Sequence, residues 1–245
     1  MTNLTATVLD PLLKADPMGP RITYYDDATG ERIELSTVTL ANWAAKTANL
    51  LRDELGAGPG SRVAVLLPAH WQTAAVLLGV WWIGAEVVLA GPGAAGPATS
   101  GTADFALCTS ERLDEADEAV AGGEVAVLSL DPFGKPVADL PIGVTDYATA
   151  VRVHGDQFIT EPRPGPALAG QSADQVLAAA SESAAASGIS AGDRVMSSLP
   201  WSTPDEVVAN LVAVFATGAS LVQVTNPDPA ALERRAHTEK VTRRL

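Results

Sequence analysis

Cysteine is almost absent from this 245-residue chain. The single cysteine, Cys108, excludes an internal disulfide, and its neighbours in the segment FALCT predict a buried strand rather than an exposed reactive thiol. We therefore expect a protein of a reducing compartment. Hydrophobic residues make up 47% of the sequence, which is enough for the core of one large α/β domain or two small ones.

Basic residues and long apolar runs are also scarce. The 16 Lys and Arg against 29 Asp and Glu give a formal net charge of −13, which opposes binding to nucleic acid or to an anionic membrane surface. The most apolar run, Ala74 to Ala85, is shorter than the roughly 18 residues that a membrane span requires. The N-terminal segment MTNLTATVLD lacks the basic region of a signal peptide, so we expect a cytoplasmic protein.

Histidines are too few and too scattered for a metal centre. His70, His154 and His237 lie far apart, and none of them forms the i, i+4 pair that places two ligands on one helical face. We expect surface or helix-end histidines, and neither a metal nor a cofactor.

Apolar patterning predicts alternating helices and strands. A helix over 4–15 and a hairpin in RITYYDDATGERIELS precede a helix over 39–55. Continuous apolar strands then alternate with helices, which indicates mostly parallel sheets covered on both faces. The expected strands are RVAVLL, EVVLA, FALCT, EVAVLSL, RVMSSL and SLVQV, and the expected helices are AAVLLGVWWIG, ERLDEADEAV, a short one near Tyr147, Ala173–Ser187, Pro204–Ala216 and one near Pro229–Glu239.

One strand–helix unit occurs twice. GAGPGSRVAVLLP at 56–68 matches GISAGDRVMSSLP at 188–200, and a helix that ends in Gly-Ala before a strand follows each of them. We interpret this as an internal duplication that gives two similar αβα subdomains. Residues 1–160, including the hairpin, form the first and residues 161–245 the second, packed as one compact unit with a ligand site at their seam.

The repeated segments resemble adenylate-forming (AMP-binding) enzymes such as acyl-CoA synthetases. The segment LLRDELGAGPGSRVAVLLPAHWQTAAVLLGVWWIGAEVVLAGP is similar to their opening subdomain, and GDRVMSSLPWSTPDEVVANLVAVFATGASLVQVTNPDP to their second. The resemblance runs from about Arg21 to Val241 and implies the layered N-terminal fold of these enzymes, with an acyl or adenylate ligand.

The phosphate-binding residues of that family are missing. The family loop, roughly Thr-Ser-Gly-Thr-Thr-Gly-x-Pro-Lys-Gly, lies between the two repeats, where this chain has EPRPGPALAGQSADQV at 161–176. Thr99-Ser100-Gly101-Thr102 matches part of the loop, but an aspartate, Asp104, comes after it where a second glycine belongs, and it precedes a strand instead of following one. The later nucleotide-binding segments and the domain with the catalytic lysine are not present in this sequence either, so we expect no catalytic residue.

Two groups of residues are candidates for binding. Pro200, Trp201, Ser202 and Thr203 correspond to the family segment that borders the acyl pocket; the alternative is that Trp201 fills the seam between the subdomains. Thr203, Pro204 and Glu206 also form a capping box pattern. Trp81 and Trp82 are adjacent on one helix, so we expect one of them to meet the other layer or a partner.

Three functions fit these observations. The leading hypothesis is a non-catalytic binding or interaction module. The second is an acyl-CoA synthetase-like ligase with degraded motifs that forms an acyl-adenylate from ATP and a carboxylic acid. The third is a regulatory or assembly subunit that forms a homodimer or binds a full-length synthetase.

Overall fold

The computed structural model describes residues 1–89 and 102–245 of the chain. The predicted elements are present, with ends close to those expected. The helices are α1 (Leu4–Ala15), α2 (Thr37–Asn49), α3 (Trp71–Trp82), α4 (Leu113–Val120), α5 (Tyr147–Val151), α6 (Ala173–Ala186), α7 (Pro204–Val207), α8 (Ala213–Ala216) and α9 (Pro229–Thr238). Two π-helical turns, η1 (Leu50–Glu54) and η3 (Val208–Val212), and a 3-10 turn, η2 (Ser110–Arg112), join or extend them.

The described strands form two sheets of five. One has the order β10 (Arg243–Arg244), β8 (Arg194–Ser197), β9 (Ser220–Thr225), β1 (Pro20–Asp26) and β2 (Glu31–Ser36), in which only the β1–β2 hairpin is antiparallel. The other has the order β4 (Glu86–Leu89), β3 (Arg62–Leu66), β5 (Phe105–Cys108), β6 (Glu124–Val127) and β7 (Thr145–Asp146), and all of its pairs are parallel. The expected α/β fold with two mostly parallel sheets is confirmed.

The β1–β2 hairpin does not join the sheet of the first predicted subdomain. We predicted it in the unit of residues 1–160, but β1 pairs with β9 along Ile22–Asp26 and so joins the sheet of the second repeat. The reason is burial: Ile22 and Tyr24 lie in the main core, and β9 offers them a parallel edge. Hydrophobic alternation identifies a hairpin but not the sheet that receives it.

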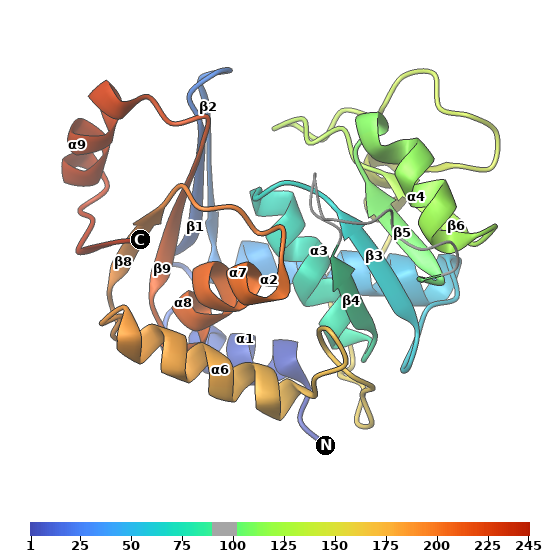
Figure 1. Cartoon of the computed structure of the whole chain (residues 1–245), viewed down its shortest axis with the longest axis horizontal. Helices are drawn as coiled ribbons and strands as arrows, with labels where there is room; N and C mark the ends of the chain where they lie inside the picture. Colours follow the sequence, from blue (N-terminus) through green and yellow to red (C-terminus); the bar gives the residue numbers. More distant parts are fainter. Residues whose placement is uncertain (90–101) are drawn as a thin grey trace.

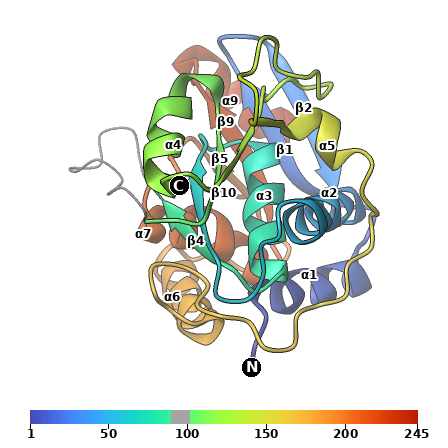
Figure 2. The same ribbon diagram turned by 90° about the vertical axis from the view of Figure 1, so that its right-hand side faces the viewer.

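Helices fill the space between the sheets and cover both outer faces (Figure 1). Helix α3 contacts β1 of one sheet and β4 of the other, and all 12 of its residues are buried. Helix α4 packs on β3, β5 and β6, and α9 contributes Leu232 and Ala236 to a cluster on the outer face of β8 and β9. Figure 2 looks onto the α4 side, with α1 and α6 at the lower end of the molecule.

The two tryptophans of α3 are both interior, which corrects one part of our expectation, that one of them could meet a partner. Trp81 is 2% exposed and Trp82 is 7% exposed. The connection between the repeats covers them: Trp81 Nε1 donates to the carbonyl of Ala167 at 2.8 Å, and Trp82 Nε1 donates to Thr160 Oγ1 at 3.0 Å. These two residues therefore offer no surface for a partner.

The two repeated units have glycines in the same backbone conformation at matching positions. Gly56 and Gly188, then Gly60 and Gly192, adopt positive φ at matching places before β3 and β8. Each strand then lies between two parallel neighbours, in the orders β4-β3-β5 and β9-β8-β10. Such glycines permit turns that other residues adopt with strain, so both units fold alike locally. An internal duplication is our interpretation of this correspondence.

The structure adds two plain findings on membranes and metals. None of the helices in the described part of the chain is long and apolar enough to span a membrane. Within the same residues, no cluster of three or more His, Cys, Asp or Glu side chains could hold a metal ion.

Candidate ligand cleft between the two sheets

A cavity of about 520 Å³ lies where strands of the two sheets end. Its walls are the carboxyl end of β9, with Asn226 after it, and the segments that follow β3, β5 and β8. The lining residues are Leu67, Pro68, Ala69, Thr109, Glu111, Arg112, Ser198, Leu199, Pro200, Ser202, Gln223, Val224, Thr225 and Asn226. We call this cavity the inter-sheet cleft. Ligands of open parallel sheets bind outside the carboxyl ends of the strands, and this cleft combines that position from both sheets.

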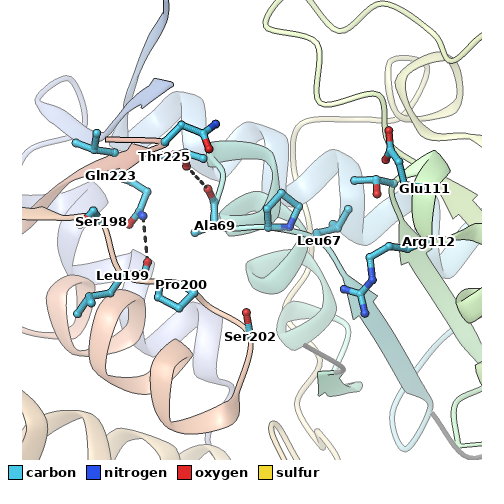
Figure 3. A pocket seen from close by; sticks show the side chains of 14 residues that line it. Leu67, Ala69, Glu111, Arg112, Ser198, Leu199, Pro200, Ser202, Gln223 and Thr225 are labelled. Atoms are coloured by element: carbon cyan, nitrogen blue, oxygen red, sulfur yellow. Dashed lines mark hydrogen bonds between the residues drawn. The ribbon is translucent and has the colours of Figure 1, made fainter. Parts of the chain in front are cut away.

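Two of the four predicted site residues line the inter-sheet cleft. Pro200 and Ser202 are on its wall, and Ser202 faces Arg112 across it (Figure 3). Trp201 lies between them in sequence but is 2% exposed and belongs to the main core. Trp201 therefore packs inward while its two neighbours in the sequence face the cleft. That Trp201 fills the seam between the two subdomains stays a prediction.

Thr203 serves the helix rather than the cleft. Its hydroxyl accepts a hydrogen bond from the backbone N–H of Glu206, and Glu206 Oε2 accepts from the N–H groups of Ser202 and Thr203 at 2.8 and 3.0 Å. This is the predicted capping box. Because the Glu206 carboxylate occupies the positive end of the helix, a second anion would be repelled there.

Gln223 was not predicted from the sequence and is the most informative polar residue of the cleft. Its Nε2 donates to the carbonyl of Leu199 at 3.1 Å, and its side chain is buried (Figure 3). Its Oε1 is buried without a hydrogen-bond partner among the described residues. An unpaired buried acceptor is costly, so this oxygen favours a ligand that donates a hydrogen bond. The signal was present in SLVQV, where one polar residue interrupts a buried strand.

Thr109, Glu111 and Arg112 were not predicted either. They come after β5, whose end becomes part of the cleft only when the two sheets meet. The Arg112 guanidinium donates to both carboxylate oxygens of Glu115. The described wall thus has one basic residue, Arg112, one acidic residue, Glu111, and no lysine.

Cys108, at the end of β5, is not a nucleophile. It is fully buried, and burial raises the pKa of its thiol to about 12. A thiol with such a pKa is protonated at neutral pH and unreactive. The interpretation of FALCT as a buried strand is confirmed.

The segment at the phosphate-loop position lies away from the inter-sheet cleft. Gly165 N–H donates to the carbonyl of Gly84, and Val87 N–H donates to that of Ala167, both at 2.9 Å, so the segment runs along the edge strand β4. Its residues line a different hollow, beside Met1 and Thr2, and none of them is in the cleft wall. Thr99, Ser100 and Gly101 of the partial motif lie outside the described residues.

Comparison with known proteins gives these features a context. Residues 16–105 match the model of the AMP-binding enzyme family. A "TIGR03089 family protein" of Mycobacterium tuberculosis is 66% identical over 248 residues, which cover 100% of this chain and 98% of that protein. The chain belongs to the TIGR03089 family.

Solved structures that resemble this TIGR03089 family member include an acyl-CoA synthetase and an anthranilate CoA ligase. An acyl-CoA synthetase of Brucella canis superposes with a TM-score of 0.81 at 18% identity, covering 99% of the chain. MatB of Rhodopseudomonas palustris superposes with a TM-score of 0.73 at 20% sequence identity and covers 96% of the chain. The anthranilate CoA ligase AuaEII, solved with anthranoyl-AMP, superposes with a TM-score of 0.70 at 15% identity and covers 97% of the chain. The chain spans about half the length of these proteins, 47% in each case.

The resemblance stated from the sequence is therefore confirmed. This TIGR03089 family member has the N-terminal fold of acyl-CoA synthetases, and its sequence matches AMP-binding enzymes over the first repeat. At these identities the structural likeness speaks for the fold alone.

Proposed function

We propose that the chain is a non-catalytic binding module that holds a small acyl or adenylate-like ligand in the inter-sheet cleft. One observation carries the proposal: the cleft lies at the strand ends of both sheets, while the segment at the phosphate-loop position lines none of it. The proposed ligand needs no metal or other cofactor.

The wall of the cleft suits such a ligand. Leucine, proline, alanine and valine side chains offer apolar contact to an acyl group, and Ser202, Thr109 and the Gln223 carbonyl provide hydrogen-bonding groups around them. A mostly apolar cavity with a few fixed polar groups is typical of small-molecule sites.

Among the described residues, the same wall lacks the groups that adenylation requires. Transfer at a phosphate needs several N–H donors and cations at the developing charge. Arg112 is bound to Glu115, and the helix N-terminus after Thr203 is occupied by Glu206. The proposal therefore separates ligand binding, which the cleft supports, from catalysis.

Thermal unfolding with ATP, AMP, coenzyme A and a non-hydrolysable acyl-adenylate tests this proposal. We expect the acyl-adenylate to stabilise the protein, by about 2.7 kcal/mol at a hundred times its dissociation constant. We expect no ATP–pyrophosphate exchange with any carboxylic acid. Exchange above background would overturn the non-catalytic proposal and favour the degraded-ligase alternative.

A matched pair of variants locates the binding. Ser198 is exposed at the cleft wall and Ser181 is exposed on α6, so tryptophan fits at either position without entering the core. We expect Ser198→Trp to abolish the stabilisation and Ser181→Trp to retain it. Equal stabilisation of both variants would place the ligand elsewhere.

A further inference from the structure

A second cavity, of about 670 Å³, opens on the other side of the wall formed by Pro68, Thr225 and Asn226. Thr225 Oγ1 donates to the carbonyl of Ala69 at 3.2 Å in this shared wall. The cavity lies between the β1–β2 hairpin, the start of α3 and the loop after β6. We call it the hairpin cavity.

Two polar side chains in the wall of the hairpin cavity lie at ion-pair distance from each other but do not form a hydrogen bond. His70 is 2% exposed and the Glu31 side chain 10% exposed. Their atoms Nε2 and Oε1 are 3.7 Å apart, beyond hydrogen-bond distance. Neither atom has a hydrogen-bond partner among the described residues. Buried polar atoms are nearly always paired, so this pair indicates a group that the protein alone does not supply.

The helix cap determines the position of the imidazole proton. His70 is the N-cap of α3, and its Nδ1 accepts the backbone N–H of Gln72 at 3.1 Å. Burial lowers the pKa of His70, against the opposing effect of Glu31, so the ring is neutral at pH 7. A neutral imidazole that accepts at Nδ1 carries its proton on Nε2. The wall of the cavity therefore holds a donor, Nε2–H, beside the acceptor Glu31 Oε1, and a ligand that bonds to both atoms must enter between them because neither is open to solvent.

We propose that the hairpin cavity binds a small aromatic molecule with a neutral primary carboxamide, or the equivalent donor–acceptor edge of a heterocycle. The carbonyl oxygen accepts from His70 Nε2 and the amide nitrogen donates to Glu31 Oε1. Two hydrogen bonds of about 2.9 Å from one amide edge fit a donor and an acceptor at this separation.

The remaining wall selects for an uncharged aromatic body. Ile33, Leu130 and the 79% exposed ring of Phe133 provide apolar contact. Asp26 adds a second carboxylate, which disfavours anions. Arg32, the basic residue among the described residues of this wall, is bound to Glu34 and Glu239. This proposal does not depend on ligand binding in the inter-sheet cleft.

Benzamide, methyl benzoate and benzoate, titrated into the full chain and followed by ligand-observed NMR, test the proposal. The three probes share one ring; methyl benzoate lacks the amide donor and benzoate is an anion. We expect benzamide to bind about tenfold more tightly than either, which corresponds to about 1.4 kcal/mol. Equal affinities, or no saturable binding of benzamide, would overturn the proposal and indicate a cavity filled by water only.

Two conservative variants assign the contacts. His70→Asn keeps an N-cap acceptor for α3 but lacks Nε2–H, and Glu31→Gln keeps the shape of the side chain but loses the charge. We expect each to weaken benzamide binding about tenfold. Glu31 begins an edge strand, so Glu31→Gln remains informative if His70→Asn does not fold. Ser198→Trp, which fills the inter-sheet cleft, is the control and leaves benzamide affinity unchanged; retained affinity in both cavity variants would refute the assignment.

Discussion

The unit β3–α3–β4 and the unit from β8 to β9 begin alike and then diverge. From Gly56 to Pro68 and from Gly188 to Pro200 the two sequences stay in register, with an offset of 132 residues. The first helix then begins at Trp71 and the second at Pro204, one residue later than this offset predicts. By Gly84 and Gly218 the offset has grown by another residue.

The second extra residue is explained by the π-helical turn. Helix α3 is a regular helix of 12 residues, whereas α7, η3 and α8 together form a helix interrupted at Val208–Val212 by i to i+5 bonding. A π turn accommodates one residue more than an α turn while keeping the flanking segments aligned. The comparison teaches that a π turn can accommodate a one-residue insertion in the helix without displacing the next strand, β9.

The two units also differ in the residue after each proline. Pro68 is succeeded by Ala69, which leaves room in the inter-sheet cleft, and Pro200 by Trp201, which fills the core behind it. The cap of the first helix is the buried His70, and that of the second is the exposed Thr203. Similar strands thus lead to different cavities, because the segments at their ends are packed differently.

Deleting one residue from each of the two helices should give the largest difference in stability between the two units. Without Ala75, every later residue of α3 turns by about 100° and its buried side chains leave their sites, so we expect no cooperative unfolding. Without Ala209, η3 can revert to an α turn, so we expect a folded protein. Circular dichroism during thermal unfolding checks both deletions. Loss of the fold in both would refute the insertion model.

The tryptophan of the second unit should be essential for stability and not for binding. Trp201→Ala should cost about 4 kcal/mol in urea unfolding, because it removes a large buried side chain. Trp201→Phe should cost far less, because Trp201 Nε1 is buried without a partner in the described structure. Acyl-adenylate affinity should be unchanged in Trp201→Phe; a clear loss of affinity would make Trp201 a ligand contact.

The arginines that begin β3 and β8 provide the third comparison. Arg194 binds Glu239, whose side chain is 6% exposed, whereas Arg62 is 46% exposed and lies 3.7 Å from Glu86. Removing the carboxylate by Glu239→Ala should cost about 3 kcal/mol at pH 7, since Arg194 loses its most buried partner and has only the more exposed Glu34 left, which it shares with Arg32. Glu86→Gln should cost less than about 1 kcal/mol.

We expect the Glu239 carboxylate to make the free energy of unfolding depend on pH in the acidic range. Burial alone would raise the pKa of Glu239, but hydrogen bonds from Tyr25, Arg194 and Arg32 outweigh it and lower the pKa to about 2. A folded-state pKa below the ordinary 4.5 stabilises the fold above pH 4.5, and this contribution is lost as the pH falls toward 2. Urea unfolding between these pH values should show a smaller pH dependence in Glu239→Gln than in the wild type. An identical pH dependence would contradict the assignment.

The helix caps should give the smallest effect. Thr203→Ala removes the acceptor for the Glu206 N–H and should cost about 1 kcal/mol in urea unfolding. Because Thr203 is outside the cleft wall, acyl-adenylate affinity should not change. Weaker binding of the acyl-adenylate by this variant would show that Thr203 contributes to the ligand site, as the sequence predicted.

The sequence predicted local elements well because their signals are local. Apolar periodicity identified α3 and β3, and the pattern of Thr203, Pro204 and Glu206 identified a capped helix. The partner of β1 depends on contacts between residues about 200 positions apart, which no local pattern encodes.

The candidate site was only half predictable for a related reason. Pro200 and Ser202 were found through the resemblance to a known family. Gln223 and Arg112 join the cleft only when two strand ends from different sheets meet, and the inward position of Trp201 depends on the core that surrounds it. The buried pair of His70 and Glu31 joins the start of a helix to a distant hairpin, so only the fold brings them together.

Chemical-shift mapping with a non-hydrolysable acyl-adenylate tests the central claim most directly. We predict that the perturbed backbone amides cluster at Thr109, Ser202 and Gln223, around the inter-sheet cleft, and that those of Glu31 and Gln72 beside the hairpin cavity do not move. Saturable shifts at the cleft would support a binding module built on the N-terminal fold of acyl-CoA synthetases. An unchanged spectrum at saturating ligand, or shifts confined to another surface, would contradict it.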